Sequence, residues 1–145
     1  MFRTCRKSSP RTSVRTEREV LDILSCNVLP SLSTNIVYKY GAKTAQTDQN
    51  DLFVSATFVA PIRVDIYDDE GSNIALDDYS AFQEVASDVP GVMVSDTSDY
   101  LESFLERESY VEAHSGQSLR HYVIYSYTAG VIHILSNNSP SLEIM

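Results

Sequence analysis

The sequence predicts an α+β fold: a single domain with a mainly antiparallel β-sheet and two or three helices packed on one face. Three observations support this prediction. Apolar and polar residues alternate over 52–60, which is the pattern of a half-buried strand. Two β-rich runs flank a short turn within 120–135, as in a hairpin. The segments 16–29, 77–86 and 98–114 carry apolar residues at helical spacing.

The first predicted element is a helix over 16–29. Thr16 and Glu19 have the spacing of a capping box, in which each side chain binds the other residue's free backbone N–H. Pro30 marks the end of this helix, and Cys26 lies on its flank as a packing residue. The apolar stripe consists of Val20, Ile23, Leu24 and Val28.

Strands are predicted next, over 35–41 and over 52–67, with a polar loop between them. Pro61 cannot donate a hydrogen bond to a neighbouring strand, so we expect a bend or a sheet edge there. After this bend we expect Ile62, Val64 and Ile66 to face the core and Arg63, Asp65 and Tyr67 to face outward.

The second half of the chain predicts two acidic helices and a closing hairpin. Asp77 or Asp78 caps the helix over 77–86, and a short apolar strand follows at 92–94. The helix over 98–114 precedes the hairpin. The predicted organisation is a flexible basic arm at 1–14, one α+β domain at 15–136 and a flexible tail at 137–145.

Charge is divided unevenly along the chain. Residues 1–20 have a net charge of +4, whereas residues 65–112 contain fourteen Asp or Glu and a single basic residue, Arg107. An acidic body repels phosphate backbones, so we expect no nucleic-acid binding except through the basic arm. The arm and the acidic face together predict contacts with protein subunits of opposite charge.

The carboxylates of 65–78 raise the alternative of a metal site. An EF-hand loop with Gly71 at its sixth position would have Ile66 at its first, and isoleucine cannot bind Ca²⁺, so that class is excluded. A looser Ca²⁺ or Mg²⁺ site, in a binding module or a metal-dependent hydrolase, would use Asp68, Asp69, Glu70 and Asn73. Turn and helix-cap chemistry explains these residues more simply, so we predict no metal and no cofactor.

Motifs for catalysis are not found in the sequence, which has no G-x-S-x-G, H-E-x-x-H or C-x-x-C pattern. His121 and His133 fall in one predicted hairpin and can share a face, but the simpler interpretation places both at the surface. Cys5 and Cys26 do not make a disulfide framework, which favours reduced thiols. We therefore predict a protein that is not an enzyme.

Charged and aromatic side chains are the candidates for contact with partners. Tyrosine is enriched at protein interfaces because its ring is apolar and its hydroxyl is polar. The predicted interaction residues are Arg3, Arg6, Lys7, Arg11 and Arg15 of the arm, Glu102 and Glu106 of the acidic helix, and Tyr125 and Tyr127 of the hairpin.

The leading functional hypothesis is a structural subunit of a larger assembly, such as a virion head, neck or tail component. The order of elements resembles, in outline only, small adaptor and terminator subunits of virus heads and tails, and also acidic secretion chaperones. An acidic, chaperone-like binder of a basic partner protein is therefore an alternative. The expected partners are other protein subunits, in a homo- or hetero-oligomer.

The sequence also bears on location. No apolar run approaches the roughly 20 residues that a membrane-spanning helix needs, so we expect no membrane contact. The first residues lack the apolar core of a secretory signal. We predict a protein of the cytoplasm or of a virion, with a mitochondrial location as the alternative because the arm is rich in Arg and Ser and poor in acids.

Overall fold

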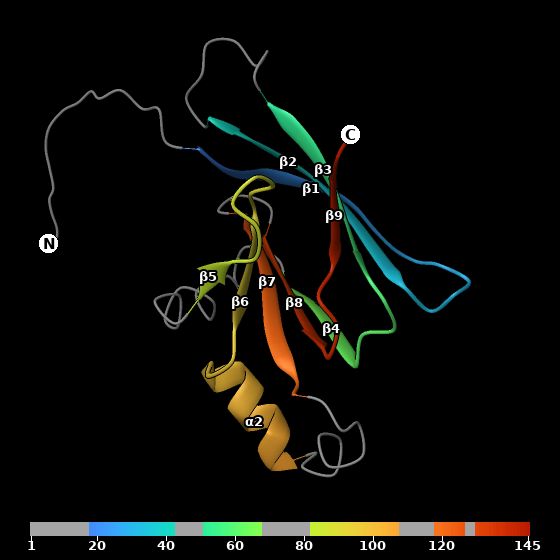
Figure 1. The fold of residues 1–145 in the computed structure, drawn as a ribbon, viewed down its shortest axis with the longest axis vertical. Helices are drawn as coiled ribbons and strands as arrows, with labels where there is room; N and C mark the ends of the chain where they lie inside the picture. Colours follow the sequence, from blue (N-terminus) through green and yellow to red (C-terminus); the bar gives the residue numbers. More distant parts are fainter. Residues whose placement is uncertain (1–17, 43–50, 68–81, 108–117, 127–129) are drawn as a thin grey trace, which may run out of the picture.

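A computed structural model describes residues 18–42, 51–67, 82–107, 118–126 and 130–145. Within these ranges the chain forms nine β-strands and a single short helix, α2 (Figure 1). The predicted α+β class with two or three helices is therefore wrong, because the fold is mainly β.

The nine strands belong to one mixed sheet, in the order β4-β8-β7-β1-β2-β3-β9, and β6 pairs with both β5 and β7. Neighbouring strands are antiparallel except β1 and β7, whose parallel pairing is the single pair Val20↔Ser126. This narrow link divides the sheet into a first half (β1, β2, β3, β9) and a second half (β4 to β8). The elements are β1 (Arg18–Val28), β2 (Thr34–Ala42), β3 (Leu52–Phe58), β4 (Arg63–Tyr67), β5 (Gln83–Glu84), β6 (Val92–Ser95), α2 (Asp99–Arg107), β7 (Arg120–Ser126), β8 (Gly130–Ser136) and β9 (Ser141–Ile144).

The two halves of the sheet enclose the main core. Phe58 of β3 meets Tyr122 of β7 edge to face, with the ring centroids 5.4 Å apart. The buried Tyr38 hydroxyl donates a hydrogen bond of 2.6 Å to the Pro90 carbonyl and so joins the halves at a second place. The fully or almost fully buried members of this core are Val20, Ile36, Tyr38, Val54, Ala56, Phe58, Val92, Tyr122, Ile124, Ile132 and Ile134.

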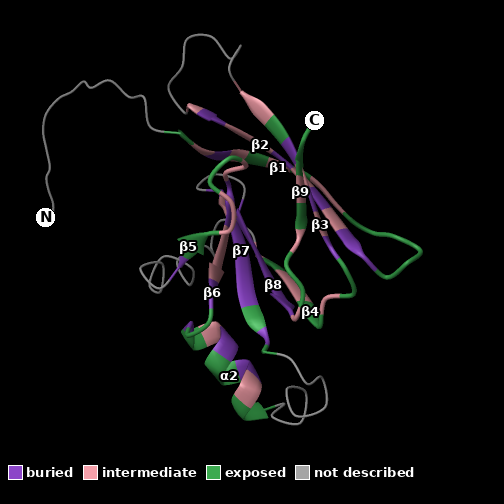
Figure 2. Ribbon diagram, in the orientation of Figure 1, coloured by how far each residue is buried: buried purple, intermediate pink, exposed green. Residues whose placement is uncertain are grey.

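The other face of the second half is covered as well, by α2 and by the segment before β6. Leu101 and Phe104 of α2 pack with Leu135 of β8, and Phe82 packs with residues of β7 and β8. All seven residues of β8 are consequently buried (Figure 2). The strands β7 and β8 thus form the middle of three layers.

The segment predicted as the first helix is strand β1. Two β-bulges interrupt its pairing with β2, one after Val20 and one after Ile23. Each bulge inserts one extra residue, so the residues that pack on the core, Val20, Ile23 and Cys26, are three apart instead of two. This spacing imitates the apolar period of a helix and explains the error.

Other predicted elements are confirmed. The strand at 35–41 is β2, and the strand-like region 52–67 is β3 and β4 with a break around Pro61. The short apolar strand is β6, and the closing hairpin is β7 with β8. The helix predicted over 98–114 is present as α2 over Asp99–Arg107, with Ser98 immediately before it, and residues 108–114 lie outside the described ranges.

Three further expectations are wrong or fall outside the described residues. Gln83 and Glu84, predicted as helical, pair with β6 as strand β5, while the rest of that predicted helix up to residue 81 is outside the described ranges. Ser141–Ile144, expected in a flexible tail, pairs with β3 as β9. Ile62 and Ile66 are exposed, because β4 is an edge strand, whereas the Tyr67 ring packs inside the second half.

Candidate functional site

A chain of buried polar side chains lies on the face of β7 and β8 that α2 covers. The register pairs Val123 with His133, so His121 is the diagonal neighbour of His133 on the same face. Ser98 Oγ lies 2.7 Å from His121 Nδ1, and His121 Nε2 lies 2.8 Å from His133 Nδ1. Ser98 and His133 have no exposed surface, and His121 is 2% exposed. We name these three residues the Ser–His–His chain.

One arrangement of protons that makes every hydrogen bond of the Ser–His–His chain runs from Ser98 to His133. Ser98 Oγ accepts the backbone N–H of Leu101 and is therefore free to donate its own proton to His121 Nδ1. His121 then carries its proton on Nε2 and donates it to His133 Nδ1. His133 is left with its proton on Nε2, the one buried side-chain nitrogen or oxygen of the described residues that has no hydrogen-bond partner.

Tyr100 of α2 covers the two imidazoles. Its ring stacks on both, with centroid distances of 4.5 Å to His121 and to His133. The Tyr100 hydroxyl donates to the Asp65 carboxylate on β4, and that carboxylate also accepts from Arg63 Nε at 2.7 Å. Burial, and then the hydrogen bond to Asp65, raise the pKa of Tyr100, so the phenol stays protonated.

Burial also controls the charge of the imidazoles. Desolvation, with a smaller contribution from neighbouring His133, lowers the pKa of His121 to about 3. Desolvation lowers the pKa of His133 to about 4, against the opposing effect of nearby Asp65. Both rings are therefore neutral at neutral pH, as the proton assignment requires.

The Ser98–His121 pair has the hydrogen bond of a nucleophile and its general base. A substrate cannot reach this pair in the structure. Ser98 is fully buried, and the Phe82 ring packs against His121 with the ring centroids 5.1 Å apart. Ser98 instead caps the first turn of α2 through the Leu101 N–H. The arrangement attaches α2 to the sheet through polar contacts.

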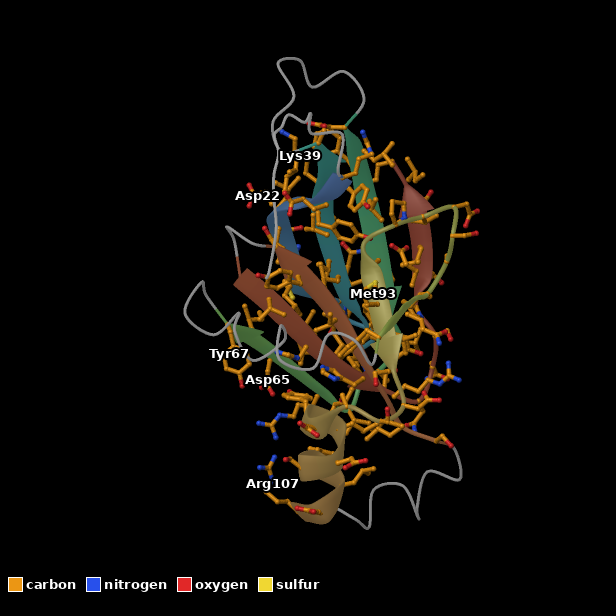
Figure 3. The ribbon with its side chains drawn as sticks, turned by 90° about the vertical axis from the view of Figure 1, so that its left-hand side faces the viewer. Asp22, Lys39, Asp65, Tyr67, Met93 and Arg107 are labelled. Atoms are coloured by element: carbon orange, nitrogen blue, oxygen red, sulfur yellow. The ribbon has the colours of Figure 1, made fainter. Side chains whose placement is uncertain are left out.

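An open pocket of about 340 Å³ lies beside this cluster, between β4 and α2. Its wall includes Arg63, Asp65, Tyr67, Tyr100 and Arg107. The labelled side chains of Asp65, Tyr67 and Arg107 project from one side of the molecule (Figure 3). Two guanidinium groups and two carboxylates, those of Asp65 and Asp99, give this pocket a mixed charge, and Arg63 and Asp65 form an ion pair within it.

A second surface lies where β1 turns into β2, and it is apolar. Val28 is 73% exposed and Leu32 is 69% exposed. Thr34 pairs with Val28 on one side and with Phe58 on the other, so the end of β3 lies alongside this turn. We name the exposed apolar residues of this region the neutral tip: Val28, Leu29, Leu32 and Val59.

The structure separates the interaction residues that the sequence predicts. Glu102 and Glu106 are exposed on the outer side of α2. Tyr125 is half-buried against Val123 and Val131, at a distance in the fold from α2. The remaining predicted residues, Arg3, Arg6, Lys7, Arg11, Arg15 and Tyr127, lie outside the described ranges, as do Asp68, Asp69, Glu70 and Asn73 of the alternative metal site.

The sequence predicts that His121 and His133 lie at the surface, and this prediction is wrong because both are buried. The signal for burial was the run 131–135, in which a histidine sits among apolar residues that face both sides of the strand. Such a run is typical of a strand covered on both faces. Ser98 and Tyr100 carry no comparable sequence signal, because their roles depend on how α2 packs.

Comparisons with known proteins identify no relative: no family model, no curated protein and no solved structure matches the chain. Two searches of the described residues are also negative. Among them, no three His, Cys, Asp or Glu side chains are grouped so that they could hold a metal ion. No helix in the same ranges is long and apolar enough to cross a membrane.

Proposed function

We propose that this chain is a non-enzymatic subunit of a larger assembly, for example a virion head, neck or tail component, and that it works in the cytoplasm or in the virion. Other protein subunits are its partners. The outer side of α2 supports this proposal: Glu102 and Glu106 are exposed there, and neither takes part in a salt bridge with another described residue.

These carboxylates are held in a fixed position. The Ser98 cap holds the start of α2, and Leu101 and Phe104 anchor its inner side in the core. A charged surface on a rigid element needs little reorganisation when it binds, which favours recognition. The natural complement is a basic segment of a neighbouring subunit, and the arm at 1–14 of another copy has that charge.

The burial of the Ser–His–His chain is consistent with a binding role. Its most reactive groups hold α2 against the sheet and do not face the solvent. Two surface features that face the solvent are the charged side of α2 and the neutral tip. Exposed charge on a fixed element and exposed apolar surface are both typical of interaction sites.

Sedimentation velocity tests the proposal on the full chain and on two variants. One variant lacks residues 1–14, and the other carries Glu102→Gln with Glu106→Gln. We expect the full chain to form a larger species at about 0.1 M salt and to lose it at about 1 M, because salt screens exposed charges. Each variant should lose that species already at the lower salt concentration.

Glu143→Gln is the matched control, because Glu143 is an exposed carboxylate on β9, outside α2. It should assemble as the unchanged chain does. If the arm deletion and the α2 variant both give the same size distribution as the full chain, the charge-based assembly is refuted.

A further inference from the structure

We infer that the neutral tip is a self-association surface, at which two copies of this chain pack tip to tip about a two-fold axis. The inference rests on the proposed function as an assembly subunit and names one of its partners, a second copy. The neutral tip is a different surface from the outer side of α2, where the charge-based contact is proposed.

The first argument is the amount of apolar surface at one place. Val28, Leu29, Leu32 and Val59 are 73%, 38%, 69% and 51% exposed. In Figure 1 the turn between β1 and β2 projects beyond the second half of the sheet, so none of the described elements of that half covers it. Large apolar side chains that are exposed together at one end of a protein are typical of an interaction site.

The second argument is the backbone of Leu32, which has a positive φ of 67°. Left-handed backbone is unfavourable for a leucine by roughly 1–2 kcal/mol, and glycine or asparagine is the usual residue there. The turn itself is held by hydrogen bonds from Leu29 N–H to Ser33 O at 2.7 Å and from Leu32 N–H to Leu29 O at 2.8 Å. Folding therefore does not call for a leucine here, whereas an exposed leucine side chain suits an apolar contact with a partner.

The third argument identifies the partner. The chain has a formal net charge of −9, so two copies repel each other over most approaches. Residues 23–38 and 52–62, which contribute β1, β2 and β3 to this end of the first half of the sheet, contain no charged residue, and the neighbouring strand β9 places its Glu143 opposite Ser55, away from the turn. Two copies can meet through this end without bringing like charges together. The contact is the same patch on both copies, which is the arrangement that a two-fold axis produces.

Sedimentation equilibrium of the full chain over a range of concentrations tests this inference. We expect a dimer that persists at about 1 M salt, because apolar contacts are not screened. Leu32→Asn should raise the dimer Kd at least about ten-fold, because each dimer loses two buried leucine side chains. Asparagine tolerates left-handed backbone, so this variant keeps the turn.

Ile66→Thr is the matched control. Ile66 is an exposed apolar residue of comparable exposure, 62%, but it lies on β4 outside the neutral tip. Threonine is a good strand residue, so the edge strand is preserved. This control should dimerise with an unchanged Kd.

A charge swap tests whether the copies meet tip to tip. Ser31 lies in the turn between Leu29 and Leu32, so Ser31→Glu and Ser31→Lys each introduce like charges into a tip-to-tip contact. Each variant alone should be monomeric at about 0.1 M salt, and a mixture of the two should form a mixed dimer. A contact between different surfaces of the two copies would show no such rescue.

The inference is overturned if the full chain is monomeric at every concentration, or if the two Ser31 variants do not pair when mixed. Neither outcome decides whether the arm and α2 form the charge-based contact of the proposed function, because salt distinguishes the two contacts. A species lost at high salt belongs to the contact of the arm and α2, whereas a species kept at high salt and lost in Leu32→Asn belongs to the neutral tip.

Discussion

The region beneath α2 and the neutral tip differ in how they relate to folding. Beneath α2, polar atoms are buried and, apart from His133 Nε2, are satisfied by partners within the fold. At the neutral tip, apolar side chains are exposed, and one of these residues, Leu32, has a left-handed backbone conformation. The hydrogen bonds of the first region are explained by the stability of the monomer. The second region is not, and for this reason it points to a partner.

The largest expected effect of a single substitution is the loss of His121. His121→Ala should lower the free energy of unfolding by about 3–4 kcal/mol, because it leaves a cavity and removes the partners of Ser98 and His133. Urea unfolding followed by circular dichroism measures this. Val28→Ala at the tip is the comparison and should change stability by less than about 0.5 kcal/mol. Equal losses at the two sites would break the distinction between them.

A pH effect of at least similar size is expected, and of the two regions compared it belongs to the one beneath α2. The folded-state pKa values of His121 and His133, about 3 and about 4, lie below their ordinary value of 6.5, so the unfolded chain takes up protons first. Stability is therefore full above about pH 7 and falls as the pH drops from 6.5 towards 4. We expect each histidine to contribute a loss on the order of 3 kcal/mol over this range.

Urea unfolding at a series of pH values checks this prediction. The double variant His121→Gln with His133→Gln should show a flatter dependence over the same window, since glutamine does not titrate. Leu32→Asn should keep the original slope, because the tip contains no ionisable side chain. If the double variant is as sensitive to acid as the unchanged chain, other groups are responsible.

The smallest expected effect has the opposite sign and lies at the tip. Leu32→Gly should raise the free energy of unfolding of the monomer by about 0.5–1 kcal/mol, because glycine adopts the left-handed backbone without strain. Thermal unfolding at a concentration below the dimer Kd measures it. A clear loss of stability instead would mean that Leu32 packs within its own monomer.

Much of the fold could be predicted where local pattern and tertiary environment agree. The alternation of Val54, Ala56 and Phe58 in β3 places these side chains in the core, where they are found. The break at Pro61 and the closing hairpin followed from the chemistry of proline and of strand-forming residues. Each of these features depends on a few neighbouring residues.

The errors arise where distant residues decide the outcome. The apolar spacing of Val20 and Ile23 fits a helix, and only the register with β2 shows that bulges produce it. The burial of His133 depends on α2 covering β8, and the roles of Ser98 and Tyr100 depend on the same packing. Of the candidate site, the sequence identified the exposed Glu102 and Glu106 but not the buried chain behind them.

The bulges of β1 have a consequence for the shape of the whole molecule. β1 contains 11 residues and β2 contains nine, although they are paired from end to end. One edge of this ribbon is therefore longer than the other by two residues, or about 7 Å. A pair of strands in which one strand has extra residues bends, with the longer strand on the outer side of the bend. We attribute the bend of β1 to this difference in length. The bend brings the start of β1 next to β7, so that one continuous sheet closes over its own core.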